Sequence, residues 1–224
     1  MAGAAVFDVD GVLVDSVVPV TASINAALRD HGLPARTAEE LRRYIGPPTY
    51  SAFAELLGQP PDAAEVAAAV ATYRAHYEVR YLDETRLFPG VAAMLERVSA
   101  RIPLAVATSK SADFAAPLLE ALGVAGFFAV TAAAAPLDSD DDKTAIVARA
   151  LGGLAALGAA GGRATAMVGD RSFDLVAARV HGLAAIGVSW GIGSVAELEA
   201  AGAEAIAATP AELGALLLGG PDGN

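Results

Sequence analysis

Short apolar runs recur along the chain and alternate with helical patterns. The first run, Ala4 to Phe7, ends in a polar segment, and later runs cover residues 101–107, 127–131, 164–168 and 184–188. Between these runs an apolar residue returns every three or four positions, which is typical of amphipathic helices. Strands that alternate with helices predict an α/β fold built on a doubly wound, Rossmann-like parallel sheet.

Residues 15–82 interrupt this alternation, because their pattern is helical throughout. Ser16 can cap a first helix that ends near Gly32, and Thr37 starts a second helix with a capping-box pattern. After a short third helix, we expect a long one from residue 62 to 81.

The change of pattern sets the expected domain boundaries. Residues 15–82 should form a small all-helical cap domain, inserted after the first strand and acting as a mobile lid. Residues 1–14 and 83–218 should form the α/β core, and residues 219–224 a disordered tail.

Two carboxylates follow the first apolar run. Asp8 and Asp10 are two residues apart, so in a strand they would point the same way, and Gly11 then ends the strand. Placing two negative charges so near each other is unfavourable, unless a cation lies between them or one carboxyl group is protonated. Both arrangements suit chemistry on a phosphate group.

Polar side chains also follow three later runs: Thr108 and Ser109, Lys143, and Asp170 with Asp174. Taken singly, Thr108 could be an ordinary helix cap, Lys143 a solvated lysine and Asp174 a favourable helix N-terminal acid. Together they fall at the carboxyl ends of predicted strands, the edge where open parallel sheets bind ligands. Hydroxyl and backbone N–H groups there suit an anion, and the carboxylates suit Mg²⁺.

In order and spacing, four segments resemble the four motifs of the haloacid dehalogenase (HAD) superfamily of hydrolases: Asp8 to Gly11, Thr108, Lys143, and Gly169-Asp170 with Asp174. The resemblance covers essentially the whole chain. Other segments resemble its phosphoglycolate phosphatase and 5′-nucleotidase-like branch, namely residues 44–48, Leu137-Asp138, 186–194, 197–198 and 201–203. Thr144 departs from the pattern, because many relatives have proline there.

The resemblance implies a Mg²⁺-dependent phosphatase that acts through an aspartyl-phosphate. It assigns catalysis to Asp8, Asp10, Thr108 and Lys143, and metal binding to Asp8, Asp10, Asp170 and Asp174. Phosphate or substrate binding is expected of Gly11, Thr108, Ser109, Lys143, Gly46 and Arg43.

Several alternatives remain open from the sequence. A dehalogenase attacks carbon and needs no acid such as Asp10, whereas a phosphomutase of the β-phosphoglucomutase kind keeps both aspartates. A phosphate-binding regulatory module would be expected to lack one of these residues. Arg43, with its neighbour Arg42, could grip a substrate carboxylate, which favours phosphoglycolate, or form a solvated face. Tyr44 and Tyr50 could stack on a nucleotide base, which favours a 5′-nucleotidase, or pack in the cap.

The composition of the chain limits the kinds of molecule that it is expected to bind. The net charge of −11 argues against nucleic acid or an anionic membrane, so we expect a small phosphomonoester as partner and a monomer or small homo-oligomer. The chain has no cysteine, which excludes thiol chemistry and disulfides. The acidic run from Asp138 to Asp142 is expected to stay in solvent. Because no signal-peptide pattern is found, we expect a cytoplasmic protein.

Overall fold

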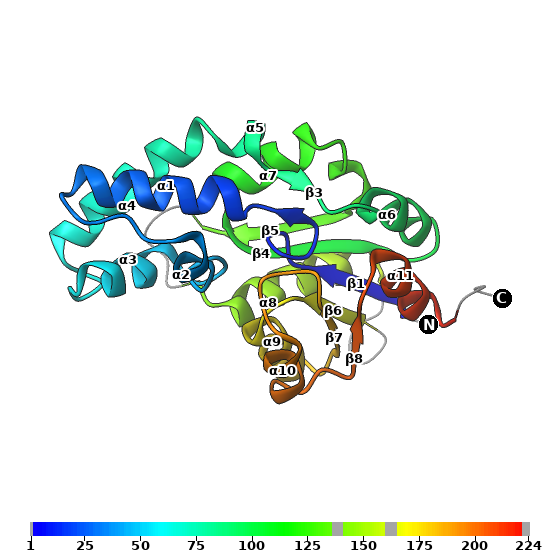
Figure 1. Ribbon diagram of the computed structural model, residues 1–224. Coiled ribbons are helices and arrows are strands. Elements are labelled where there is room, and N and C mark those ends of the chain that lie inside the picture. Colours follow the sequence, from blue (N-terminus) through cyan, green and yellow to red (C-terminus); the bar gives the residue numbers. More distant parts are fainter. Residues whose placement is uncertain (1, 136–140, 160–164, 221–224) are drawn as a thin grey trace. The chain divides into compact units, whose positions relative to one another are not determined.

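The computed structural model describes residues 2–135, 141–159 and 165–220 (Figure 1). Its main sheet has six parallel strands in the order β5-β4-β1-β6-β7-β8. Their bounds are β1 Ala4–Phe7, β4 Leu104–Ser111, β5 Val130–Ala134, β6 Thr165–Gly169, β7 Ala184–Val188 and β8 Ala205–Ala207. The predicted α/β fold with a parallel sheet is confirmed.

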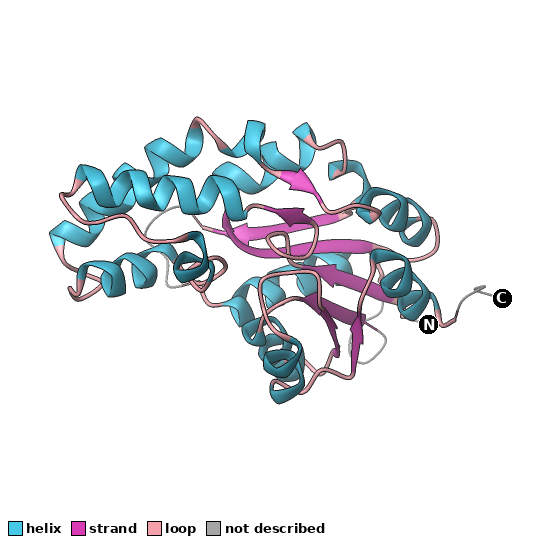
Figure 2. Cartoon of the chain, viewed as in Figure 1, coloured by secondary structure: helices cyan, strands magenta, loops and turns pink. Residues whose placement is uncertain are grey.

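The order of strands and helices makes the sheet doubly wound (Figure 2). From β1 the chain moves one way to β4 and β5, and then returns past β1 to β6, β7 and β8. Right-handed crossovers in opposite directions place their helices on opposite faces of the sheet. The helices are α6 Val91–Ser99, α7 Ala112–Ala121, α8 Lys143–Ala156, α9 Ser172–Val180, α10 Val195–Ala200 and α11 Pro210–Leu218, with a 3₁₀ turn at Ala125–Phe127.

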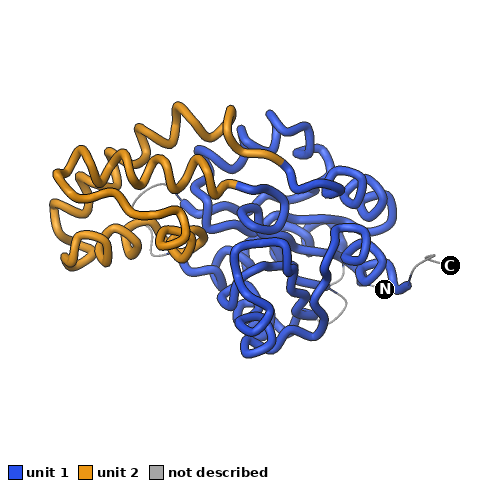
Figure 3. Tube along the Cα trace, in the orientation of Figure 1, with its two compact units in different colours: residues 1–15, 87–224 blue, residues 16–86 orange. Residues whose placement is uncertain are grey.

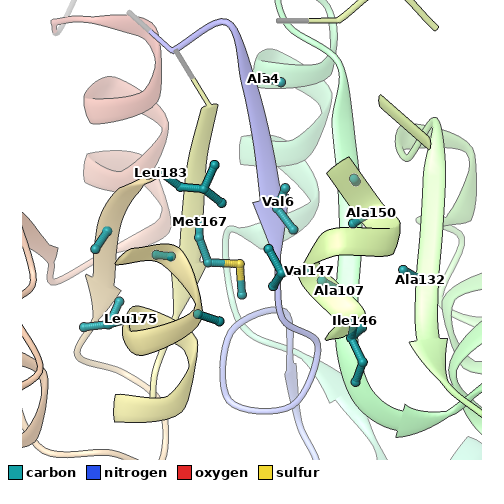
Figure 4. Packing of buried hydrophobic residues seen from close by; sticks show 14 of the residues in the cluster. Ala4, Val6, Ala107, Ala132, Ile146, Val147, Ala150, Met167, Leu175 and Leu183 are labelled. Atoms are coloured by element: carbon teal, nitrogen blue, oxygen red, sulfur yellow. The ribbon is translucent and has the colours of Figure 1, made fainter. Parts of the chain in front are cut away.

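Helices α8 and α9 cover one face of the sheet. Val6 of β1 and Met167 of β6 point from the strands toward Val147 of α8 and Leu175 of α9 (Figure 4). All four residues of β1 are completely buried, as expected for a central strand covered on both faces. β1 is therefore packed along its whole length.

Two strand boundaries differ from the predicted ones. β4 was expected at 101–107, but Ile102 still bonds back to Val98 at the end of α6, and Pro103 has no N–H to donate. The strand continues to Ser111 instead. β5 begins at Val130, because the preceding apolar residues form the 3₁₀ turn.

Helix α8 continues through the Gly152-Gly153 pair and ends at Ala156. A Cβ atom on Gly153 would lie 2.7 Å from a methyl group of Val130. The glycine therefore allows α8 to approach β5 closely.

The structure divides into two compact units, shown in Figure 3. Unit 1 contains residues 1–15 and 87–224, and unit 2 contains residues 16–86. The expected boundaries were 14/15 and 82/83. The short strands β2 (Val14–Asp15) and β3 (Arg86–Leu87), which were not predicted, pair next to both boundaries.

Unit 2 is helical within residues 16–86. Its helices are α1 Val17–Asp30, α2 Ala38–Arg42, α3 Thr49–Leu57, α4 Ala64–Glu78 and α5 Tyr81–Glu84. The capping box of Thr37 is present, whereas Ser16 makes no capping hydrogen bond. The long helix predicted for 62–81 is wrong at its end: it breaks after Glu78, although no glycine or proline marks the break.

At the C-terminus, α11 ends on Gly219, whose φ of 85° lies in the left-handed region. Gly220 donates a hydrogen bond to Ala215, so the first two residues of the expected tail belong to the end of this helix. Residues 221–224 lie outside the described part. Among the described residues, none of the helices has the length and apolarity that a membrane crossing requires.

Candidate active site

Asp8 directly follows β1, at the carboxyl end of this central strand. It is 3% exposed, and its backbone N–H donates to the carbonyl of Val168 in β6 at 3.0 Å. Its side-chain Oδ1 accepts a hydrogen bond from the N–H of Val9 at 2.7 Å. The chain then turns at Gly11 with a φ of 81°. β1 thus presents a fixed, buried carboxylate at the edge of the sheet.

Strand β6 and helix α9 supply two more carboxylates. Asp170 follows β6 and Asp174 lies in the first turn of α9, and both are completely buried. Oδ2 of Asp170 accepts from the N–H of Ile192 at 2.7 Å. Oδ2 of Asp174 accepts from the N–H of Arg171 at 3.2 Å. Backbone donors therefore fix one oxygen of each carboxylate.

Lys143, the first residue of α8, brings a cation to these carboxylates. The preceding residue, Asp142, caps the helix by accepting from the N–H of Ala145 at 2.7 Å. The Nζ of Lys143 lies 2.9 Å from Oδ1 of Asp8 and 2.9 Å from Oδ1 of Asp174. Burial alone would lower the pKa of Lys143, but the charges of Asp174 and Asp8 raise it to about 12. The ammonium therefore stays protonated.

Asp8, Asp170 and Asp174 form what we call the carboxylate cluster, because one oxygen from each lies within 4.8 Å of the others. Burial, and then the charge of Asp174, raise the pKa of Asp170 to about 8. Burial also raises the pKa of Asp174 to about 6, although Lys143 opposes the shift. If all three carboxylates were ionised, they would carry more negative charge than Lys143 balances.

The carboxylate cluster fits a divalent cation. Oδ1 of Asp170 is buried and has no hydrogen-bond partner among the described residues. Carboxylate oxygens are the donors that Mg²⁺ and Ca²⁺ prefer, and a bound cation would remove the cost of the buried like charges. The donor set and the orphan oxygen both point to such an ion.

Glycines surround the carboxylate cluster where side chains would not fit. A Cβ atom on Gly11 would lie 2.1 Å from Oδ2 of Asp170, and one on Gly169 would lie 2.1 Å from Cβ of Asp174. A Cβ on Gly191 would lie 2.4 Å from the carbonyl oxygen of Gly11. In the sequence, Gly191 belongs to a segment that resembles the family, but the sequence did not show why a glycine is needed there. Its role is to let three chain segments meet.

The side chain of Asp10 lies outside the carboxylate cluster. Its Oδ2 pairs with the Nζ of Lys110 in β4 at 3.1 Å, and the two side chains are 11% and 6% exposed. The sequence had placed Asp10 beside Asp8 in one site with a cation, and here Lys110 supplies a cation for Asp10. Sequence reasoning missed Lys110, although Lys110 and Lys143 are the only lysines in the chain.

Thr108 and Ser109 lie within β4, because this strand continues past its predicted end at residue 107. Thr108 is 1% exposed, and its hydroxyl oxygen accepts a hydrogen bond from the N–H of Lys110 at 3.2 Å. The pairing of β4 with β5 is irregular here: Thr108 faces Ala133, but Ser111 faces the very next residue, Ala134. The two intervening residues bulge out of the ladder.

A supporting network, also missed, holds the start of α9. Glu197 of α10 accepts from the N–H of Ser172 at 2.8 Å and from Nε of Arg171 at 3.0 Å. In addition, Nε1 of Trp190 donates to the carbonyl of Val12 at 3.1 Å, which ties the loop after β7 to the turn after β1. These contacts join the loops that carry Asp8 and Asp170.

Arg43 and Gly46, predicted to bind substrate, belong to unit 2. The guanidinium of Arg43 forms an ion pair with Glu55, and it also lies 4.8 Å from the ring centroid of Tyr44. Its charge is thus already balanced, and the ring of Tyr44 already faces a cation. Gly46 has a φ of 102°, so its place is set by the turn before α3.

Arg43 also borders a cavity of about 440 Å³ in unit 2, which we call the arginine cavity. It is lined by Arg36, Glu39, Glu40, Leu41, Arg43, Tyr44, Glu55 and Leu56. Three glutamates and two arginines leave it without a cationic excess. The role of Arg43 in binding a substrate carboxylate stays a prediction.

The acidic run is described only at its end. Asp141 forms a two-pronged ion pair with Arg149, at 2.9 and 3.0 Å, and Asp142 caps α8. Asp142 is exposed to solvent as expected, although it caps the helix, whereas Asp141 is half-buried against Arg149. Residues 138–140, like Leu137, lie outside the described part.

Comparison with known proteins agrees with this geometry. The model of a family described as haloacid dehalogenase-like hydrolase matches residues 5–188. The chain is 36% identical over 211 residues to the probable phosphatase IndB of Dickeya dadantii, covering 93% of this chain and 90% of IndB. It is 32% identical to a phosphoglycolate phosphatase of Agrobacterium fabrum, covering 87% of this chain and 84% of that protein.

Another relative has a different name. The chain is 34% identical to the tyrosine-protein kinase PtkA of Mycobacterium tuberculosis over 84% of its own length, but it spans only 62% of PtkA. Among solved structures, a predicted phosphatase from Clostridium acetobutylicum has a TM-score of 0.89 at 27% identity, covering 98% of this chain and 99% of the other.

Proposed function

The chain belongs to the haloacid dehalogenase-like hydrolase family and is a phosphatase, and from this premise we propose that it hydrolyses a small phosphomonoester through an aspartyl-phosphate. One observation carries the proposal. The buried carboxylate of Asp8 lies in the carboxylate cluster and within 2.9 Å of Lys143, at the carboxyl end of the central strand. Such a nucleophile is held in place before substrate arrives.

The proposed cofactor is Mg²⁺. The carboxylates of Asp8, Asp170 and Asp174, with the backbone carbonyl of Asp10, would hold it. When bound, it would neutralise charge on the cluster and on the phosphoryl oxygens. The orphan oxygen of Asp170 supports this assignment.

In the first proposed step, a carboxylate oxygen of Asp8 attacks phosphorus as the ester bond to the leaving oxygen breaks. Asp10 gives its proton to that oxygen, so the alcohol leaves neutral. Lys143 and the hydroxyl of Thr108 hold the phosphoryl oxygens, on which the transition state spreads its negative charge. Lys143 suits this role because its raised pKa keeps it charged.

In the second step, water attacks the aspartyl-phosphate. Asp10, now a carboxylate, takes the proton of this water, and the bond between phosphorus and Asp8 breaks. Inorganic phosphate leaves and Asp8 is regenerated. The Nζ of Lys110 lies 3.1 Å from Oδ2 of Asp10 and so helps to fix the position of the group that takes this proton.

The preferred substrate is 2-phosphoglycolate or a similar small ester. Support comes from the phosphoglycolate phosphatase relative, which the chain matches over most of its length. Unit 2 is proposed to act as a cap that excludes water during the reaction.

The test is phosphate release from 2-phosphoglycolate, nucleoside monophosphates and β-glucose 1-phosphate, with Mg²⁺ and with EDTA. The proposal predicts metal-dependent release with 2-phosphoglycolate as the best substrate. A nucleotide as best substrate would replace the substrate assignment. Isomerisation of β-glucose 1-phosphate without net phosphate release would replace hydrolysis by phosphomutase activity.

A further inference from the structure

Phe173 is an aromatic residue beside the carboxylate cluster to which the proposed mechanism gives no role. It is the second residue of α9, directly before Asp174, and it is half-buried. The Nζ of Lys143 lies 5.8 Å from the centroid of its ring. Aromatic rings attract a cation that lies over their face within about 6 Å. The ring is therefore a further partner of this ammonium, besides Asp8 and Asp174.

The same ring also contacts the guanidinium of Arg171, whose Cζ lies 5.5 Å from the centroid. Nε of Arg171 donates in turn to Glu197 of α10 at 3.0 Å. Glu197 also accepts a hydrogen bond from the N–H of Ser172 at 2.8 Å, which ties the backbone next to Phe173 to α10. Both contacts restrict the position of the ring.

A lysine benefits from such a support because of its own structure. Its charge is compact and sits on a flexible four-carbon chain, whereas the proposed task of Lys143 is to meet phosphoryl oxygens at one place. A displacement of about 1 Å in an active site can lower the rate about a hundredfold. The ring gives the ammonium a contact outside the carboxylate cluster, so more than the two carboxylates defines its position.

Building on the proposed phosphatase function, we propose that Phe173 is a positioning residue of the reaction. Its ring holds the ammonium of Lys143 by a cation–π contact, while Arg171 and Glu197 hold the ring. Phe173 acts through Lys143, and the charge that Lys143 stabilises is largest in the transition state. A weaker contact should therefore lower kcat and leave KM nearly unchanged.

Fluorinated phenylalanines at position 173 test this directly, because fluorine withdraws electron density from the face of the ring and barely changes its size. Phenylalanine and its mono-, di- and trifluorinated forms are introduced at this one position. kcat and KM are measured with Mg²⁺ and the ester that the wild type hydrolyses fastest. kcat should fall with each added fluorine, by about twofold to thirtyfold over the series, the range of a cation–π contact.

The same series at Phe128 is the matched control. The ring of Phe128 lies edge-to-face against that of Phe7, with centroids 6.1 Å apart, so fluorination there changes an aromatic pair and not the contact of a cation. kcat should stay nearly constant across this series.

A second series at Phe173, in Arg171→Gln, separates the two cations on the ring. The substitution removes the guanidinium and leaves Lys143. kcat should still fall with each added fluorine, although its starting value can differ from that of the wild type. Loss of the dependence in Arg171→Gln would overturn the contact with Lys143 as its cause.

Two ordinary substitutions complete the test. Phe173→Tyr keeps a ring that attracts cations and should keep most of kcat, whereas Phe173→Leu should lower kcat at least as far as the trifluorinated form. If Phe173→Leu does not fold, the fluorinated series still decides, because it preserves the shape of the side chain.

A kcat that does not depend on fluorination at position 173, or that depends on it equally at position 128, would overturn the role of Phe173 and leave the phosphatase intact. Absence of metal-dependent phosphate release by the wild type from any ester would instead overturn the proposed function itself. The two failures are therefore distinguishable.

Discussion

The carboxylate cluster of unit 1 and the arginine cavity of unit 2 are both built from charged residues, but they differ in burial. Asp170 and Asp174 are completely buried, and backbone N–H groups and glycines fix their positions. In the arginine cavity, the side chains of Arg43 and Glu55 are 62% and 58% exposed and balance each other.

The difference in burial indicates which of the two charged clusters is built to bind an ion. Buried charges that are not fully compensated strongly destabilise a folded protein unless a counter-ion binds them. The carboxylate cluster should therefore be more stable with a cation bound. Exposed pairs are screened by water and contribute little to stability. Substitutions in the carboxylate cluster should therefore have large effects on ion binding, whereas substitutions in the arginine cavity should have small effects on stability.

The largest expected effect comes from Asp8→Asn. The amide has nearly the same shape but cannot act as the carboxylate nucleophile, so metal-dependent phosphate release should vanish. Asp62→Asn makes the same chemical change at an exposed position of unit 2 and should keep wild-type activity. Retained turnover in purified Asp8→Asn, free of contaminating phosphatase, would remove Asp8 from the mechanism.

Gly11→Ala should have the next largest effect. Its Cβ would collide with Asp170 at 2.1 Å, and a shift of the carboxylate by about 1 Å can lower the rate about a hundredfold. Gly32→Ala in unit 2 is the matched control, because Gly32 has a similar positive φ of 72° but open space around it. kcat/KM and thermal unfolding of both variants separate crowding from backbone strain. Equal behaviour of the two would contradict the close packing.

A pH effect should distinguish the cluster from any exposed carboxylate. The pKa of Asp170 is raised from 3.8 to about 8, so the folded protein keeps a proton that the unfolded chain releases. With EDTA present, the contribution of Asp170 to the free energy of unfolding should therefore fall as the pH rises from about 4 to about 8. Above that pH it should stay constant.

The Tm of Asp170→Asn minus that of the wild type measures this cost, because the contributions of the other carboxylates are the same in both proteins. The difference should increase across that pH range in EDTA. Saturating Mg²⁺ should reduce it by stabilising the wild type, because the ion binds the ionised form. A difference independent of pH would mean that burial does not hold Asp170 protonated.

The smallest effect is expected from Arg43→Ala. It breaks an exposed ion pair, so the free energy of unfolding should fall by no more than about 1 kcal/mol. kcat/KM for 2-phosphoglycolate should stay close to the wild-type value. Urea unfolding and steady-state kinetics check both points, and a clear catalytic loss in Arg43→Ala would indicate that Arg43 binds the substrate.

The sequence allowed the main parts of the site to be predicted because each follows an apolar run. Asp8 and Asp170 were placed correctly at strand ends, since buried parallel strands have a strong apolar pattern. Lys143 was expected at the same edge of the sheet, and the structure brings it, as the first residue of α8, to Asp8 and Asp174.

What the sequence did not reveal depends on contacts between distant segments. The pairing of Lys110 with Asp10 requires a bulge in β4, and no residue type marks a bulge there. The neutralisation of Arg43 by Glu55 joins two helices across a turn. The need for Gly191 arises only where the loop after β7 meets the turn after β1.

The central claim is that Asp8 becomes phosphorylated, and rapid acid quenching during turnover tests it most directly. Wild-type protein is mixed with Mg²⁺ and 2-phosphoglycolate, quenched within the first turnovers, digested and mapped by mass spectrometry. The account predicts one added phosphoryl group on the peptide that contains Asp8, and none in Asp8→Asn. A phosphoryl group on any other residue, or turnover by Asp8→Asn, would contradict it.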